Sequence, residues 1–246
     1  MFSRLAAAAK MPETLPSSSP ISTPISTPIR PQGVFGGTFD PVHYGHLRLA
    51  EEAAELLGFS SVRWVPAGRP ALRALPQANP WQRLEMVRRA IAGNPRFLLD
   101  TAEVEAEHIS YTVPTLERLR REDVCGARQP LVLLTGVDAF ARLEEWHRWR
   151  SLFELAHIAV VCRPGYSLQA ENLPAALADE FRRRCDADPA CLAAAPAGRI
   201  VTFAMTPLDI SATRIRAFLA QGVTPRYLLP DAVIDYIHGQ RLYMEN

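Results

Sequence analysis

Residues 34–57 have the sequence VFGGTFDPVHYGHLRLAEEAAELL, which joins three patterns in one short stretch. A brief apolar run is closed by Gly36 and Gly37, and from His46 to Leu57 apolar residues recur at helical spacing before another glycine. This order predicts a strand, a glycine turn and a helix. It is the beginning of an α/β unit.

The same alternation continues along the chain. Asn79 and Pro80 are suited to be the N-cap and first residue of a helix with one apolar face. The runs LVLL and IAVV are apolar at successive positions, as in strands that are covered on both faces. We expect an α/β fold, a doubly wound and mostly parallel sheet with helices on both faces. An α+β fold with the same elements in another order stays open, because periodicity does not order strands. Further strands are predicted at residues 61–66, 97–99, 131–134, 158–161 and 200–203.

The composition narrows the class of protein. Lys and Arg number 27 against 26 Asp and Glu in 246 residues, so no overall field attracts nucleic acid or anionic lipid, and we expect neither partner. No run approaches 18 apolar residues, so no spanning helix is predicted. Four cysteines without a CxxC pair indicate reduced thiols and a cytoplasmic protein. The oligomeric state stays open, a homo-oligomer included.

Residues 1–32 differ from the rest of the chain. From Pro12 to Pro31 the sequence is PETLPSSSPISTPISTPIRP, whose prolines remove backbone donors. We predict a disordered tail over residues 1–32 and one folded domain over residues 33–246. An organellar transit peptide is the second interpretation of the tail, although Glu13 and the prolines speak against an amphipathic helix.

The segment GGTFDPVHYGHL, residues 36–47, follows the first predicted strand. It contains neither GxGxxG nor GxxxxGK[ST], so the dinucleotide and P-loop fingerprints are both absent. Its glycines would let a phosphate approach the backbone at a helix N-terminus, and His43 and His46 could donate hydrogen bonds to an anionic oxygen. The segment therefore predicts a phosphate site, with ordinary structural histidines as the alternative.

A second group of polar residues lies in ISATRIRAFL, residues 210–219. Ser211 and Thr213 start a predicted helix that carries Arg214 and Arg216 near its positive end, where cations are disfavoured. A bound polyphosphate would resolve this conflict. Ordinary caps and solvated arginines are the alternative.

These two segments carry a family resemblance. GGTFDPVHYGHL resembles the first signature of the nucleotidylyltransferase superfamily with the (T/H)xGH motif, and ISATRIR resembles its second, usually ISSTxxR. The stretches SYTVPTL, LLTGVDAF, EEWHRW and VVCRPGY are similar to the bacterial nicotinate-nucleotide adenylyltransferase family, and the resemblance runs from Gly33 to the C-terminus. There are two departures. RPALR replaces a loop that is often PPHK, and Ala212 replaces a serine.

The resemblance implies a Rossmann-like fold and transfer of AMP from ATP, with Mg²⁺, to nicotinate mononucleotide, which yields deamido-NAD and pyrophosphate. It implies that His43 and His46 donate to the α-phosphate and that Arg216 holds the leaving pyrophosphate, with no metal ligand from the protein. The ATP site it implies comprises Gly36, Gly37, Thr38, Phe39, His46, Gly136, Asp138, Ile210, Ser211, Thr213 and Arg216. The acceptor site it implies comprises Arg73, Tyr111, Thr112 and Trp146.

Three other functions stay open at this point. A related enzyme could use phosphopantetheine as its acceptor or transfer a cytidylyl group, although the SYT and tryptophan stretches favour pyridine nucleotides. A non-catalytic nucleotide sensor could share the fold, although both histidines and the distal arginine are present. A metallohydrolase could use His43 and His46 as ligands, but no third ligand follows at a supporting spacing.

Overall fold

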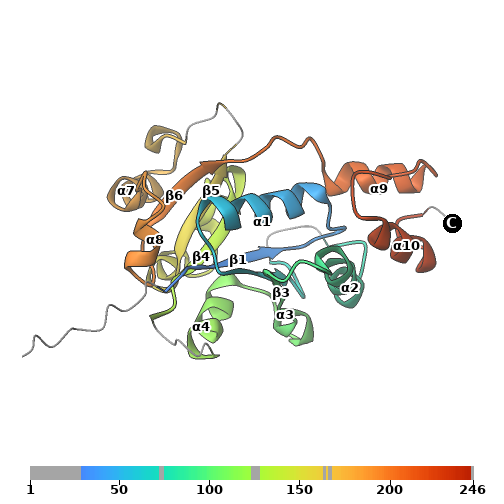
Figure 1. Cartoon of the computed structure of the whole chain (residues 1–246), viewed down its shortest axis with the longest axis horizontal. Helices are drawn as coiled ribbons and strands as arrows, with labels where there is room; N and C mark the ends of the chain where they lie inside the picture. Colours follow the sequence, from blue (N-terminus) through green and yellow to red (C-terminus); the bar gives the residue numbers. More distant parts are fainter. Residues whose placement is uncertain (1–28, 72–74, 123–127, 163–164, 166–167, 245–246) are drawn as a thin grey trace, which may run out of the picture.

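Figure 1 shows the computed structural model, which describes residues 29–71, 75–122, 128–162, 165 and 168–244. Within these residues the strands form one sheet of order β3-β2-β1-β4-β5-β6, and every neighbouring pair is parallel. The predicted doubly wound sheet is confirmed, and the α+β alternative is wrong. The strands are β1 (Gln32–Gly37), β2 (Ser61–Pro66), β3 (Phe97–Leu99), β4 (Leu131–Gly136), β5 (His157–Cys162) and β6 (Ile200–Ala204).

Helices cover both faces of the sheet because side chains alternate along each strand. Phe35, Val132 and Leu134 belong to one core, and Val34 and Leu133 to the other. The first core is closed by α1 (Tyr44–Leu56), α2 (Pro80–Ile91), α8 (Cys191–Ala194), α9 (Ala212–Ala220) and α10 (Asp231–Gly239). The second is closed by α4 (Thr112–Glu122), α5 (Val137–Phe140), α6 (Leu152–Leu155) and α7 (Ala175–Arg184).

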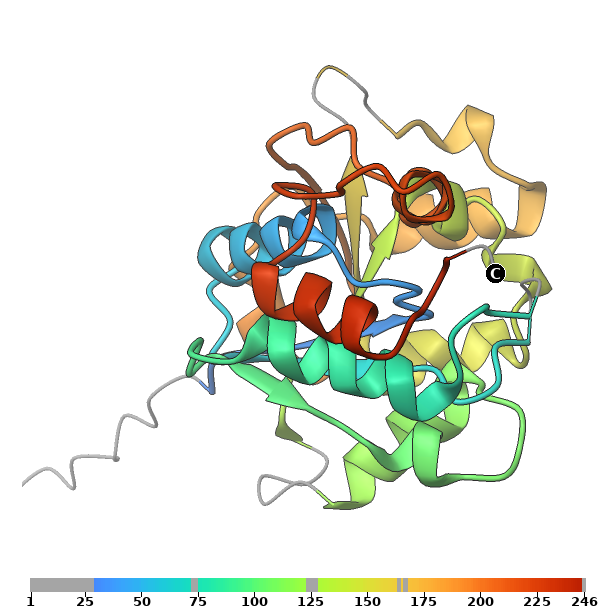
Figure 2. The ribbon, with the colours of Figure 1, turned by 90° about the vertical axis from the view of Figure 1, so that its right-hand side faces the viewer.

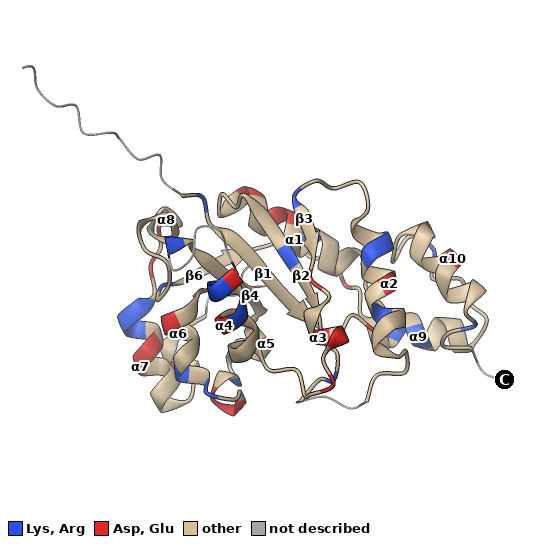
Figure 3. Ribbon diagram, turned by 90° about the horizontal axis from the view of Figure 1, so that it is seen from below, with Lys and Arg blue, Asp and Glu red and all other residues tan. Residues whose placement is uncertain are grey.

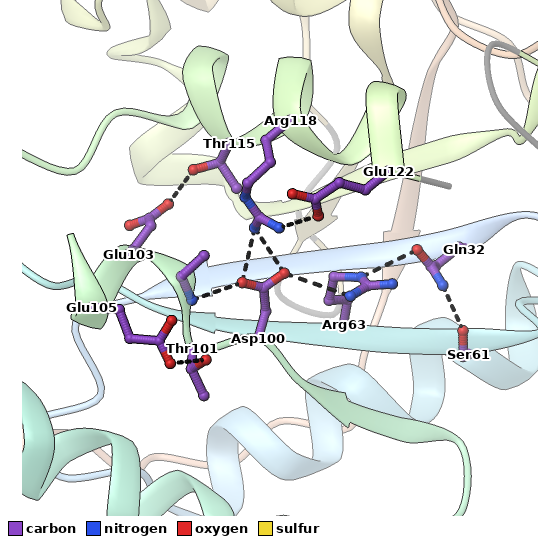
Figure 4. A network of polar contacts seen from close by, with 11 residues as sticks. Gln32, Ser61, Arg63, Asp100, Thr101, Glu103, Glu105, Thr115, Arg118 and Glu122 are labelled. Atoms are coloured by element: carbon purple, nitrogen blue, oxygen red, sulfur yellow. Dashed lines mark hydrogen bonds and ion pairs between the residues drawn. The ribbon is translucent and has the colours of Figure 1, made fainter. Parts of the chain in front are cut away.

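The remaining short elements lie at the edge of the sheet or beside the second core. Helix α3 (Ala102–Glu105) follows the edge strand β3. Asp100, between β3 and α3, accepts two hydrogen bonds of 2.8 Å from Arg118 of α4 and so ties α4 to the sheet edge (Figure 4). The 3₁₀ turns are η2 (Leu143–Glu145), η3 (Trp149–Ser151) and η4 (Ala170–Asn172).

The helix starts follow the sequence signals closely. Asn79 accepts from the backbone N–H of Gln82 at 2.9 Å, and the Gln82 side chain accepts from the Asn79 N–H at 2.9 Å, which is a capping box. Helix α1 begins at Tyr44, two residues before the predicted start, so both signature histidines lie at its N-terminus. Its first turn therefore faces the loop after β1.

The C-terminal helices lie at the carboxyl ends of the strands, opposite the start of the described chain (Figure 1). Helix α10 packs against α2 (Figure 2), where the Arg89 guanidinium lies 4.8 Å from the centroid of the Tyr236 ring. This packing brings the end of the chain back to the loop after β1.

Residues 1–28 of the predicted tail lie outside the described residues. Within residues 29–32, Arg30 donates to the carbonyl oxygens of Gly58 and Phe59 at 3.1 and 3.0 Å, and Gln32 already belongs to β1. The last residues of the predicted tail thus take part in the fold.

Basic and acidic residues are interspersed along the helices (Figure 3). In the part of the chain that the structure describes, no helix has both the length and the apolar character that crossing a membrane requires.

Candidate active site

Gly36 and Gly37 end β1 next to β4, where the strand order reverses and where open α/β sheets bind ligands. A Cβ on Gly37 would lie 2.7 Å from the Phe39 ring, so that ring folds directly over the glycine. A Cβ on Gly36 would have the Val65 carbonyl oxygen, 4.0 Å away, as its nearest neighbour. Gly36 therefore presents an open stretch of backbone to a ligand.

His43 and His46 stand together at the N-terminus of α1. His43 is the N-cap, and its ring stacks on that of His46 with 3.8 Å between centroids and 25° between planes. The His43 backbone N–H donates to Nδ1 of His46 at 3.3 Å. A neutral His46 ring then carries its hydrogen on Nε2, which leaves that nitrogen as the donor.

His43 is a buried histidine, 6% exposed. Burial lowers the pKa of His43 to about 4, so the ring is neutral at pH 7. Its Nδ1 is buried without a hydrogen-bond partner among the described residues. A buried polar atom without a partner is costly and rare in a folded protein, and a catalytic role or a bound ion is one explanation for it.

The second signature reaches this loop through one of its arginines. Arg216 Nη1 donates to the Asp40 carbonyl oxygen at 2.6 Å, and Nη2 donates to Thr213 Oγ1 at 3.4 Å. Ser211 caps α9 by accepting from the Arg214 backbone N–H at 3.2 Å. The Arg214 side chain instead lies 3.9 Å from a carboxylate oxygen of Asp209. Arg216, and not Arg214, faces the predicted phosphate site.

Asp40 organises this junction, a role that sequence reasoning missed. Its carboxylate accepts from the backbone N–H groups of Gln77 and Ala78 at 2.9 and 3.1 Å and from the Tyr243 hydroxyl at 2.6 Å. Burial and the hydrogen bond to Asp40 raise the pKa of Tyr243, so its hydroxyl stays a donor. Tyr243 lies near the chain end, where no local pattern marks it.

Two of the predicted acceptor residues, Tyr111 and Thr112, lie at the start of α4. Thr112 is the first residue of α4, and the Tyr111 ring lies 4.7 Å from that of His147, the neighbour of Trp146. Trp146 itself is half-buried against the second core. Arg73 lies outside the described residues.

The other predicted residues lie in three places: after β1, at the junction of β4 and α5, and just before α9. Gly136 caps α5, and no atom lies within 4 Å of where its Cβ would be. Asp138 is exposed in the first turn of α5. The Ile210 carbonyl oxygen lies 3.8 Å from where a Cβ on Gly45 would be, and the Thr38 carbonyl oxygen accepts from Arg83 at 2.8 Å.

The described residues contain no group of three or more His, Cys, Asp or Glu side chains that could hold a metal ion. His43 and His46 stack on each other at the helix start instead of converging on a shared point with a third ligand. The metallohydrolase alternative receives no support from this arrangement.

An open glycine backbone, two histidines at a helix N-terminus and an arginine from a distant helix define an α/β protein built to bind nucleotide phosphates. The chain belongs to the cytidylyltransferase-like family, whose model matches residues 34–218. Its curated relatives carry a more specific name. A probable nicotinate-nucleotide adenylyltransferase of Dechloromonas aromatica is 61% identical, over 87% of this chain and 97% of the relative.

A second relative of the same name, from Halorhodospira halophila, is 50% identical over 83% of this chain and 91% of its own. Among solved structures, a Plasmodium falciparum nicotinic acid mononucleotide adenylyltransferase complexed with NaAD has a TM-score of 0.62 at 15% identity. That match covers 87% of this chain and 97% of the other. At this identity it shows a shared fold.

Proposed function

We propose that this enzyme transfers AMP from ATP to nicotinate mononucleotide, producing deamido-NAD and pyrophosphate in NAD biosynthesis. The observation that carries the proposal is the junction of the two signatures, where Arg216 meets the backbone of Asp40 beside the paired histidines. The name shared by the Dechloromonas aromatica and Halorhodospira halophila relatives supports the choice of substrate.

The reaction requires two anions to approach and charge on the α-phosphate to be neutralised. The attacking phosphate monoester has a second pKa of about 6, so it is largely ionised at neutral pH and needs no general base. Catalysis then depends on position and fixed donors. Nε2–H of His46 and one ring N–H of neutral His43 donate to the α-phosphate, next to the open backbone of Gly36.

The leaving pyrophosphate is held by the second signature. Arg216 carries the charge, while Ser211 and Thr213 add hydroxyls at the N-terminus of α9. The anion also offsets the unfavourable position of an arginine near the positive end of that helix. Asp138, exposed after β4, is suited to the ribose of ATP.

Mg²⁺ accompanies the triphosphate in this proposal. Asp40, the carboxylate nearest to Arg216, already accepts bonds from two N–H groups and a hydroxyl. The donor set of the site thus fits a cation held by phosphate oxygens and water, as is usual for Mg²⁺, and we assign it no side chain.

The nicotinate carboxylate is suited to the start of α4. Backbone N–H groups of the first helical turn have no partner within the helix, and they favour an anion. Tyr111 directly precedes this helix, and we assign the pyridine ring to the aromatic surfaces of Tyr111 and Trp146. We place the enzyme in the cytoplasm, and a homo-oligomer remains a prediction from the sequence.

Pyrophosphate release tests this function. Purified protein with ATP and Mg²⁺ should release pyrophosphate with nicotinate mononucleotide about 10- to 10³-fold faster than with nicotinamide mononucleotide, because N–H donors meet a carboxylate better than an amide NH₂. The His46→Ala variant is assayed in parallel. Its turnover should be lower by at least about 10²-fold, as expected for losing one oxyanion donor.

Each other outcome selects a different function. Equal rates with both mononucleotides would remove the carboxylate preference but keep the reaction class. Release with phosphopantetheine alone would assign the enzyme to the related branch. No release with any of the three would favour a nucleotide sensor.

A further inference from the structure

Arg83 is a buried cation close to the phosphate loop that the mechanism has not used. The side chain is 0% exposed and belongs to the first turn of α2. Burying a charge is costly, and the positive end of a helix disfavours a cation further. An arginine at this position must therefore be compensated by specific partners.

The hydrogen-bond partners of Arg83 are backbone carbonyl oxygens from three separate segments. Nη1 donates to the Thr38 carbonyl oxygen at 2.8 Å, Nη2 to that of Gly68 at 2.9 Å and Nε to that of Ala78 at 3.2 Å. The guanidinium is planar and holds its donors in fixed directions. The three bonds thus fix the relative positions of the segments that they join.

Two of these segments lie on opposite sides of the proposed reaction. Thr38 belongs to the glycine loop of the ATP site. Gly68 follows β2, and its backbone N–H donates to Ser110 Oγ at 2.9 Å, directly before Tyr111 and Thr112. A Cβ on Gly68 would lie 1.9 Å from the Glu103 carbonyl oxygen, so the loop is also pressed against α3.

The contacts of the Gly68 loop with α3 extend further, to α4. Glu103 accepts a hydrogen bond from Thr115, one turn into that helix (Figure 4). The backbone N–H of Ala67 donates to the Gly37 carbonyl oxygen at 2.9 Å, and this hydrogen bond ends the pairing between β1 and β2. Past that point Arg83 connects the Thr38 loop with the Gly68 loop.

We propose that Arg83 is a positioning residue that fixes the ATP loop at Thr38 relative to the acceptor segment at Ser110–Thr112, and so sets the approach of the acceptor phosphate to the α-phosphorus. The proposal rests on the adenylyl transfer proposed above. Each loop keeps its own contacts to its own substrate, so losing Arg83 should impair transfer more than binding.

The test compares Arg83 with Arg120, a second arginine that joins carbonyl oxygens of separate segments. Arg120 donates to the carbonyl oxygens of Leu155 at 2.8 Å and Pro196 at 2.7 Å, at the amino ends of β5 and β6. It thus has the same kind of bonds at the other end of the sheet. Arg120→Met is the matched control.

Arg83→Met and Arg83→Lys should each lower kcat about 10²-fold, the cost of a misplacement near 1 Å, with both KM values within about threefold of wild type. Arg120→Met should lower the melting temperature similarly and leave kcat within about twofold. Wild-type kcat in Arg83→Met, or an equal loss in Arg120→Met, would overturn the proposal. Wild-type kcat in Arg83→Lys alone would also overturn it, because the charge and not the bridge would then matter.

Ser110→Ala keeps the proposal testable if both Arg83 variants fail to fold. It removes the acceptor of the Gly68 N–H without leaving a buried charge, and it should lower kcat severalfold with smaller changes in KM. An unchanged kcat would count against the link.

A second measurement, which does not depend on enzymatic activity, tests the role of Arg83 even if the proposed function is wrong. If wild-type protein shows no transfer, amide hydrogen exchange still tests the bridge, since exchange in residues 36–40 and 67–71 should accelerate together in Arg83→Met or Arg83→Lys and not in Arg120→Met. Unchanged exchange in either segment would overturn the link.

Discussion

Gly45 shows how a single residue sets the geometry of the histidine pair. It lies in the first turn of α1, where alanine would be the better helix former by about 0.5–1 kcal/mol. A Cβ there would lie 3.0 Å from Nδ1 and 3.1 Å from Cε1 of His43. The glycine thus gives up helix stability to let the His43 ring lie close to the backbone.

Gly45→Ala should therefore separate stability from activity. The added methyl group moves the His43 ring by a few tenths of an ångström, and we expect kcat to fall about 10-fold or more, while the melting temperature stays unchanged or rises. Steady-state kinetics and thermal melts measure the two effects.

Gly239→Ala is the matched control for Gly45→Ala. Gly239 ends α10, and no atom lies within 4 Å of where its Cβ would be. This variant should leave kcat unchanged. A Gly45→Ala enzyme with wild-type kcat would show that the His43 ring does not need its present position.

Helix α9 assigns different tasks to two arginines two positions apart. Residues i and i+2 face different directions on a helix, so Arg216 reaches the Asp40 carbonyl oxygen while Arg214 lies near Asp209 and over the Phe218 ring. Only one of them is placed to meet a triphosphate bound at the glycine loop.

Arg216→Ala should raise KM for ATP about 10-fold or more and slow transfer, because a hydrogen bond to a charged group contributes about 1.5–3 kcal/mol. Arg214→Ala on the same helix is the control and should change KM for ATP less than about threefold. Steady-state kinetics at varied ATP provide the comparison. The reverse ranking would reassign the phosphate-binding arginine.

Local sequence patterns predicted most elements of this fold. The segments 61–66 and 97–99 are strands with the predicted bounds. The other four strands extend beyond the predicted residues by one or two residues at one or both ends, because apolar runs mark the buried centre of a strand better than its ends. The Asn79 cap and the helix after Ser211 also follow from local hydrogen bonding.

The residues that position the site through tertiary contacts could not be predicted in the same way. Arg83 follows a helix cap and precedes Leu84, so its local pattern is that of an ordinary polar residue on an amphipathic helix. Its role depends on carbonyl groups from residues 38 and 68, which only the tertiary fold brings to it. Tyr243 and Asp40, which are 203 residues apart, have the same kind of dependence.

At the scale of the whole molecule, two buried histidines, one at each end of the sheet, make the free energy of unfolding depend on pH. His43 lies at the carboxyl ends of the strands. His157, at the start of β5, donates from Nε2 to the Ala195 carbonyl oxygen at 2.8 Å and accepts at Nδ1 from the Arg199 N–H at 3.0 Å. Burial lowers the pKa of both histidines. A proton added to His157 would set Nδ1–H against the Arg199 N–H.

The protein should therefore lose stability as the pH falls from about 7 to 5. Both histidines have lower pKa values in the folded chain than the value of about 6.5 in an unfolded one. At these two sites the unfolded state therefore binds more protons in this range, and their contribution to the free energy of unfolding rises with pH. Each histidine contributes a slope of up to about 1.4 kcal/mol per pH unit below pH 6.5, and His43 retains it down to about pH 4.

Urea unfolding at pH 7, 6 and 5 measures the slope. His157→Gln removes one of the two protonation sites and should flatten the curve, whereas the same change at exposed His108 should leave it unaltered. If His157→Gln lost stability in parallel with wild type over this range, His157 would not be one of the groups that couple folding to pH.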